Sequence, residues 1–340
     1  SGASLADALH MAAMGARGTT KEELLRVLGP LPEFADRFSE THDFGKTLHI
    51  ANRLWADDHA RLRSSYAQSI ANFGAGADRL AIQAHPEEAR ATINRWVESA
   101  TGGSVSELLP KGSLSNLTEL VLTNAVHFKA GWASEFSPSL TKPGPFTMES
   151  GSTTPASFMH REGSLPAADL PEIGAKVAEL PYRDSDFGML LLVPNDARGI
   201  AKLESAIGSD TLPSYTSKLA PRRVDLTLPK FHFKAGGNVS AKLQALGIRT
   251  AFSPGHADFG DMLDEGAKAL KIDAVFHEAS IAVDEHGTEA SAATATVMGV
   301  RGLALGAPLE VRADRPFVFA IRNRKNGRIL FFGRVGRPVS

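Results

Sequence analysis

The stretch Lys271–Arg301, KIDAVFHEASIAVDEHGTEASAATATVMGVR, changes character half-way along its length. Its first half alternates as a half-buried strand does, with one face made of Val275, His277, Ala279, Ile281 and Val283. After Gly287, which offers a hinge, the run Thr288–Thr296 has no bulky side chain but keeps the period of two. This run predicts a strand that is small enough to enter a sheet and too small to demand burial.

An Ala/Thr-rich surface linker, or a helix that begins at Thr288, is the plainer interpretation of such a composition. The order E-x-G-T-E-A-S-A-A-T, however, closely resembles the reactive-loop hinge of the serpins. A second segment, Asp314–Pro338, reads DRPFVFAIRNRKNGRILFFGRVGRP and resembles their C-terminal signature. Two long matches at the right separation favour the serpin interpretation over the linker.

This resemblance implies an α+β fold with three β-sheets, about eight helices and an exposed reactive-centre loop at about 285–312. We expect one serpin domain over residues 1–340, similar to a prokaryotic member, in a chain that lacks the family's first helix. The resemblance also implies a suicide-substrate mechanism, in which a serine protease cleaves the loop and the freed strand inserts into the main sheet, trapping the acyl-enzyme. The hinge of that strand would comprise Glu285, Gly287, Thr288, Glu289, Ala290, Ser291, Ala292, Ala293 and Thr294.

The position of the reactive bond follows from the family's usual spacing. Counting from Glu285 places it at Arg301–Gly302, although a shift by a residue or so, to Val300 or Leu303, stays open. An arginine suits proteases whose specificity pocket holds a carboxylate, which is the trypsin-like class. Inserting about a dozen residues adds ladder hydrogen bonds, so the uncleaved state would be a kinetic trap.

Two polar residues interrupt apolar strand faces. Asn124 lies in the row of Leu120–Phe128 that is otherwise apolar, and His277 does the same in its own strand. A polar residue in such a row is more often a core group that is already hydrogen-bonded than a functional group. If the two strands are neighbours, however, Asn124 and His277 can each supply the other's hydrogen bond. The resemblance places both at the serpin shutter, together with the helical serines Ser1 and Ser4. It places Trp132 at the breach, where the loop first enters the sheet.

Other elements follow from periodicity and capping. We expect three helices here. One covers Ser1–Met14 with Ser4 as its cap, one begins at Pro86, and one covers Val239–Leu246. Strands are expected over Leu48–Ala56, twice within Val177–Pro194, over Leu226–Phe233, and in a hairpin whose turn holds Asn326-Gly327.

Composition limits the partners. The net charge is −1, without long runs of one sign, which argues against nucleic acid and anionic membranes. Apolar runs such as Met189–Val193 are too short to span a bilayer. The acidic segment Pro32–Lys46 argues against heparin activation, because this region is a basic helix in heparin-activated serpins. No signal peptide is visible; we expect an extracellular monomer, able to form loop-sheet polymers.

An enzyme is not expected, because the chain lacks G-x-S-x-G, H-E-x-x-H, a phosphate loop and cysteine. His256, Asp258 and Asp261 could suggest a metal site, but their spacing is common by chance, and we expect neither metal nor cofactor. A non-inhibitory carrier, chaperone or storage serpin is the main alternative. Such serpins usually have charged, bulky or proline residues in the hinge, whereas Thr288–Thr296 carries one charge, on Glu289.

Overall fold

The computed structural model describes all residues except 32–47, 72–74, 209, 266–268, 289–306 and 340. The contacts divide the chain into two compact units, one of Ser1–Phe128 with Lys234–Ser280 and one of Lys129–Phe233 with Ile281–Ser340. The expectation of one domain over 1–340 stays a prediction. Among the described residues, no helix has the length and apolar character needed to cross a membrane.

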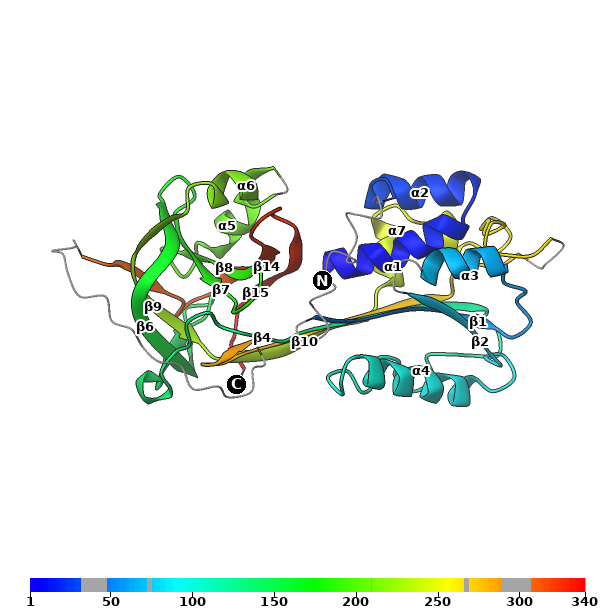
Figure 1. Ribbon diagram of the computed structural model, residues 1–340, viewed down its shortest axis with the longest axis horizontal. Coiled ribbons are helices and arrows are strands. Elements are labelled where there is room, and N and C mark those ends of the chain that lie inside the picture. The colour runs from blue at the N-terminus through cyan, green and yellow to red at the C-terminus, as the bar shows by residue number, and fades with distance from the viewer. Residues whose placement is uncertain (32–47, 72–74, 209, 266–268, 289–306, 340) are drawn as a thin grey trace. The chain divides into compact units, whose positions relative to one another are not determined.

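The first unit is a sheet with helices on both faces (Figure 1). One face packs against α1, α3 and α7 through a core that includes Leu54, Leu122 and Val275, and the other packs against α4 through Trp55 and Val121. Its helices are α1 (Gly2–Gly15), α2 (Gly18–Leu28), α3 (Ser64–Ala71), α4 (Pro86–Ala100) and α7 (Ser240–Ala245), with a 3₁₀ turn at Thr250–Phe252. Its strands are β1 (Leu48–Asp57), β2 (Gly76–Leu80) and β3 (Leu120–Phe128).

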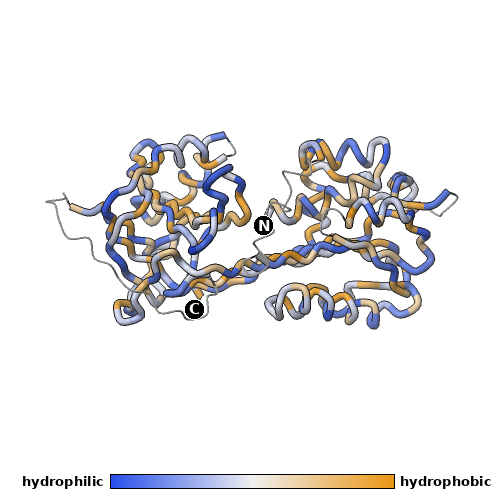
Figure 2. The backbone as a smooth tube through the Cα atoms, in the orientation of Figure 1, coloured by the Kyte–Doolittle hydropathy of each residue, from blue (hydrophilic) through white to orange (hydrophobic). Residues whose placement is uncertain are grey.

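Two of these helices show how the sequence sets their ends. α4 begins at Pro86 with Glu87 and Glu88 in its first turn, where carboxylates meet the positive end of the helix dipole. Hydrophobic and hydrophilic residues alternate within its turns, as an amphipathic helix requires (Figure 2). α1 confirms the predicted helix, but the expected cap was wrong: the Ser1 side chain accepts the bond from the Ser4 amide.

Two strands belong to both units, because each begins in one and ends in the other. They are β10 (Phe231–Asn238) and β11 (Ala274–Val283). The predicted strand over Leu226–Phe233 is in fact split between β9 and β10 at Lys230. In the first unit β11 runs parallel to β3 and pairs with it directly from Ala274↔Val121 to Ser280↔His127.

The second unit contains the whole of an eight-stranded sheet with the order β13-β9-β6-β7-β8-β14-β15, in which β5 also pairs with β6. Its strands are β4 (Ala130–Gly131), β5 (Lys142–Thr147), β6 (Thr153–Leu170), β7 (Ala175–Pro181), β8 (Phe187–Pro194), β9 (Ala220–Pro229), β12 (Gly287–Thr288), β13 (Leu309–Arg312), β14 (Phe317–Asn323) and β15 (Ile329–Val335). Its helices are α5 (Ile200–Ala206) and α6 (Thr211–Thr216), with a 3₁₀ turn at Pro138–Leu140.

The described residues therefore form two large sheets and seven α-helices, against the three sheets and about eight helices expected. The long strand β6 explains the difference in sheets. It pairs with β5 and β9 over most of its length and with β7 over Ala167–Leu170, so two expected sheets share one strand. The predicted α+β class and the hairpin of β14 and β15 are confirmed.

Candidate functional site

The four predicted shutter residues meet in the first unit. Asn124 and His277 are register partners on β3 and β11, and their Oδ1 and Nδ1 atoms lie 2.5 Å apart, which confirms the predicted hydrogen bond. The Asn124 amide nitrogen donates to Ser4 Oγ at 2.5 Å, and Ser1 caps the helix that carries Ser4. The arrangement ties one helix to two strands through buried polar atoms.

Sequence reasoning missed a fifth member, Asn52 on β1. Asn52 is the register partner of Asn124, and its Oδ1 atom accepts a hydrogen bond from the Asn124 amide nitrogen. The signal was present in the sequence, because Asn52 interrupts the apolar row of Leu48–Ala56 as Asn124 interrupts its own row. The network therefore spans three neighbouring strands.

The shutter histidine is neutral at ordinary pH. Burial is the main cause that lowers the pKa of His277 to about 3. A neutral imidazole suits this position, because it can share one proton with the amide oxygen without placing a charge in the core.

The start of the predicted hinge is already part of a sheet. Gly287 and Thr288 form β12, which pairs with Gly131 and Ala130 of β4 and, through Thr288, with Val283 of β11. A Cβ atom on residue 287 would lie 2.1 Å from the Ala130 carbonyl oxygen. Close strand approach, rather than hinge-like backbone freedom, is therefore what requires glycine here.

Thr288 is fully buried, and its hydroxyl lies 2.7 Å from the Tyr182 hydroxyl. Tyr182 stacks on the predicted breach residue Trp132 at a ring-centre distance of 4.8 Å. Trp132 in turn donates from Nε1 to the carbonyl oxygen of Asp284 at 2.9 Å. The breach residues thus hold the hinge as one unit.

Glu285, the first residue of the predicted hinge, is a buried ion-pair partner rather than a loop residue. Its carboxylate lies 2.9 Å from Lys230 Nζ and accepts a 2.8 Å hydrogen bond from the Thr141 hydroxyl. Burial alone would raise the pKa of Glu285, but these two partners outweigh it and hold the pKa below its ordinary value. The backbone just before β12 is therefore anchored by charge.

A second ion pair flanks β12. His286 Nδ1 lies 3.0 Å from a carboxylate oxygen of Glu135, and the Arg183 guanidinium donates to the other oxygen at 2.7 Å. No sequence pattern predicts the roles of Tyr182, Lys230, Glu135 and Arg183, because these residues come from separate segments that follow no shared pattern.

The predicted reactive bond and the rest of the hinge lie outside the described residues. These are Arg301 and Gly302, and Glu289, Ala290, Ser291, Ala292, Ala293 and Thr294. Their roles stay predictions. The expected loop at about 285–312 does have paired ends, because β12 precedes the undescribed segment and β13 follows it, parallel to β9.

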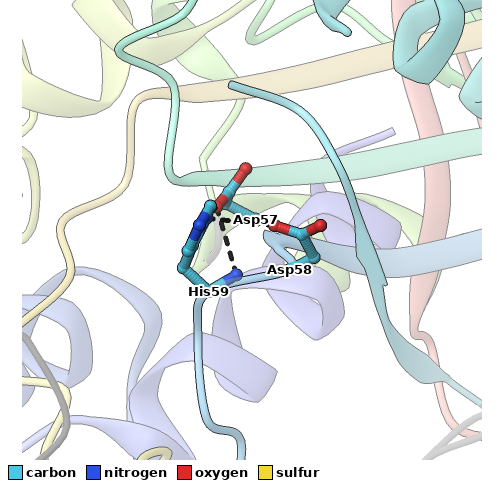
Figure 3. A group of neighbouring side chains, drawn as sticks. All are labelled: Asp57, Asp58 and His59. Carbon is cyan, nitrogen blue, oxygen red and sulfur yellow. Dashed lines mark hydrogen bonds and ion pairs between the residues drawn. The ribbon is translucent and has the colours of Figure 1, made fainter. Parts of the chain in front are cut away.

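Metal-ligand side chains gather at one place in the described part of the chain, at Asp57, Asp58 and His59 (Figure 3). The Asp57 carboxylate is already occupied there: one oxygen accepts from the His59 amide and the other from the Gln83 amide. The residues of the weaker sequence candidate are used elsewhere, since Asp258 accepts from the Gly260 amide and Asp261 pairs with Arg17.

Comparison with known proteins agrees with this architecture. The family model described as Serpin (serine protease inhibitor) matches residues 1–338. The chain belongs to the serpin family. Leukocyte elastase inhibitor of Equus caballus is 32% identical, over 98% of this chain and 91% of that protein.

Solved serpin structures show the same fold. A highly specific serpin of the insect Tenebrio molitor superposes with a TM-score of 0.88 at 28% identity, covering 99% of this serpin and 90% of that chain. Human thyroxine-binding globulin, solved with thyroxine, gives 0.87 at 27% identity, covering 99% and 91%. The family includes inhibitory members and non-inhibitory ones, and serpins in general are protease inhibitors rather than enzymes.

Proposed function

We propose that this serpin inhibits trypsin-like serine proteases as a suicide substrate. The protease attacks the Arg301–Gly302 bond and forms an ester through its own serine. The freed segment then extends β12 into the main sheet before the ester is hydrolysed. An extracellular site of action and a monomeric state, with loop-sheet polymers under stress, belong to the same proposal.

The observation that carries this proposal is the position of Thr288. It is buried beside the end of β11, and the small residues of the hinge follow it directly in the sequence. A strand that has begun to pair can propagate residue by residue, because each added pair contributes ladder hydrogen bonds of about 1 kcal/mol net. Small alternating side chains present little bulk to resist that propagation.

The second observation is that insertion has not occurred between β3 and β11. The two strands pair directly over seven residue pairs, so the described structure is the uninserted form along that length. The proposed reaction would separate this pair and replace it with two new strand interfaces. A metastable inhibitor requires both features: β3 and β11 that are still paired with each other, and a hinge whose first residues already pair as a strand.

Incubation with trypsin followed by a denaturing gel tests the proposal. We expect a covalent complex that survives detergent, and a released peptide that begins at Gly302. Arg301→Ala should abolish the complex with trypsin, whereas the control Lys325→Ala, at an exposed hairpin position, should leave it intact. Cleavage without any complex, in the unmodified chain, contradicts inhibition.

A carrier function is the second candidate, and one observation favours it. A groove of about 400 Å³ lies in the second unit between α6 and the β14–β15 hairpin, lined by apolar groups that include Leu212, Ile329 and Phe332. The similar human thyroxine-binding globulin was solved in complex with thyroxine. The same gel separates the candidates, because a carrier would be cut by trypsin without forming an ester-linked complex.

A further inference from the structure

The sheet face that α4 covers changes from apolar to polar along its length. Under α4 it presents large apolar groups such as Trp55, Val121 and Phe276. Farther along the same three strands it presents His49, His127, Glu278 and Ser280. The register places His49 beside His127, and His127 beside Ser280. Glu278 is the register partner of Ala125, two residues before His127.

The rings of His49 and His127 lie beside one another on this face. Their rings are stacked with centres 6.1 Å apart and planes inclined by 28°. Two imidazoles on one tetrahedral ion place their ring centres about 5 Å apart, given metal–nitrogen bonds of about 2.1 Å. A small rotation about the side-chain bonds therefore brings a nitrogen of each ring to a common point. His127 is buried, so that point is largely shielded from bulk water.

Glu278 supplies a third ligand of the right chemistry from the neighbouring strand. The register places Glu278 diagonally opposite His127 on the same face of the sheet, and glutamate has a long side chain that can extend toward the rings. Its half-buried carboxylate has no hydrogen bond or ion pair with any described residue, although the charge of Lys234 acts on it. A bound cation would give this carboxylate a direct partner.

We propose that His49, His127 and Glu278 form a binding site for a divalent transition metal ion such as Zn²⁺, with water completing the coordination. Two imidazoles and one carboxylate suit Zn²⁺, Ni²⁺ and Cu²⁺, and exclude Ca²⁺ and Mg²⁺, which require oxygen ligands. The donor atoms are not yet as closely gathered as those of Asp57, Asp58 and His59, so binding requires side-chain rotation.

The site has a consequence that rests on the proposed inhibitory function. His127 belongs to β3 and Glu278 to β11, the two strands that loop insertion must separate. A metal ion that is coordinated by both strands binds the closed sheet and loses a ligand when the sheet opens. Binding should therefore stabilise the uncleaved form and slow insertion, because a ligand stabilises the state that it prefers.

Calorimetric titration of tag-free, uncleaved protein with ZnCl₂ tests the site without any protease. We expect one ion per chain at micromolar affinity, weakened at least tenfold by His49→Gln, which changes a half-buried position and leaves the core intact. The control His59→Asn removes a ligand of the Asp57 cluster and should leave the affinity unchanged. Absence of binding, or loss of binding in His59→Asn alone, overturns the proposal.

Glu278→Gln tests the bridge between β3 and β11. We expect it to weaken Zn²⁺ binding and to abolish the rise in melting temperature that Zn²⁺ produces in the parent chain. An unchanged rise shows that the ion binds without β11, which overturns the bridge.

With trypsin, saturating Zn²⁺ should lower the yield of covalent complex relative to cleaved chain, while trypsin alone with the same Zn²⁺ serves as control. Titration remains decisive even if no complex forms at all.

Discussion

The predicted shutter and the predicted breach are held together by different physical means. The shutter joins helix α1 to β1, β3 and β11 through neutral, buried amide, hydroxyl and imidazole groups. The predicted breach anchors β12 with stacked aromatic rings, with the ion pair of Glu285 and with the hydrogen bond between His286 and Glu135. At the predicted shutter β3 and β11 pair directly, whereas at the predicted breach Gly287 and Thr288 of the predicted hinge already pair as β12.

This difference indicates where opening is resisted and where insertion begins. Separating β3 from β11 breaks a bond between two buried polar groups, and each would then lack a partner in an apolar core. Extending β12 from Thr288 leaves the breach contacts in place. We infer that the shutter sets the barrier to insertion and that the breach sets its starting point.

The largest expected effect on inhibition is at Thr288, where we infer that insertion begins. Thr288→Arg would bury an unpaired guanidinium beside Tyr182, which costs several kcal/mol, so the hinge should leave the sheet. The loop would still be cut at Arg301 but would insert late, after much of the ester has hydrolysed. The ratio of serpin consumed to trypsin inactivated should rise well above that of the control Thr288→Val, which keeps the β-branched shape. Equal ratios in the two variants would mean that early burial of residue 288 does not matter.

The next largest effect is expected on the stability of the chain, at His277 of the predicted shutter. His277→Ala leaves the buried Asn124 amide oxygen without its imidazole partner, at a cost of about 1–3 kcal/mol. The variant should melt earlier and polymerise on mild heating, as followed by thermal denaturation and native gels. His256→Ala, at an exposed histidine, serves as the control. A His277→Ala chain that stays monomeric and melts normally would show that this pair does not gate the sheet.

A smaller effect is expected at Tyr182. Tyr182→Phe keeps the stack on Trp132 but removes the bond to the Thr288 hydroxyl, which contributes about 1 kcal/mol. Removing both hydroxyls, in Tyr182→Phe with Thr288→Val, should cost less than the sum of the two single changes, since no buried hydroxyl is left alone. Melting temperatures of the four chains measure this coupling, and strict additivity would show that the bond contributes nothing.

How much of this the sequence could predict depends on whether a site lies within regular strands. Asn124 and His277 could be found because a polar residue stands out in an alternating apolar row, and Asn52 obeys the same rule. Tyr182 and Lys230 lie at the ends of strands, where alternation stops and tertiary contacts decide the neighbours. For the same reason, no pattern could reveal that Thr288 is buried before cleavage.

The smallest effect near neutral pH concerns proton binding at the shutter. Because burial lowers the pKa of His277 from 6.5 to about 3, the unfolded chain binds more protons between these values. Stability from this group is complete above about pH 6.5 and decreases as the pH falls toward 3, by under about 1 kcal/mol at pH 6. Urea titrations at pH 7.5 and 5.5 should show a smaller loss in His277→Asn than in the parent chain. Equal losses would contradict a neutral, buried His277.

The thermal stability of the chain before and after cleavage by trypsin tests the account most directly. If the cleaved hinge extends β12 between β3 and β11, it adds about ten ladder hydrogen bonds of about 1 kcal/mol each. The cleaved chain should then melt at least about 20 °C above the uncleaved chain, at the scale of about 2–4 °C per kcal/mol known for somewhat smaller domains. A cleaved chain that melts at the same temperature as the uncleaved chain would show that the strand does not insert, and would contradict the proposed mechanism.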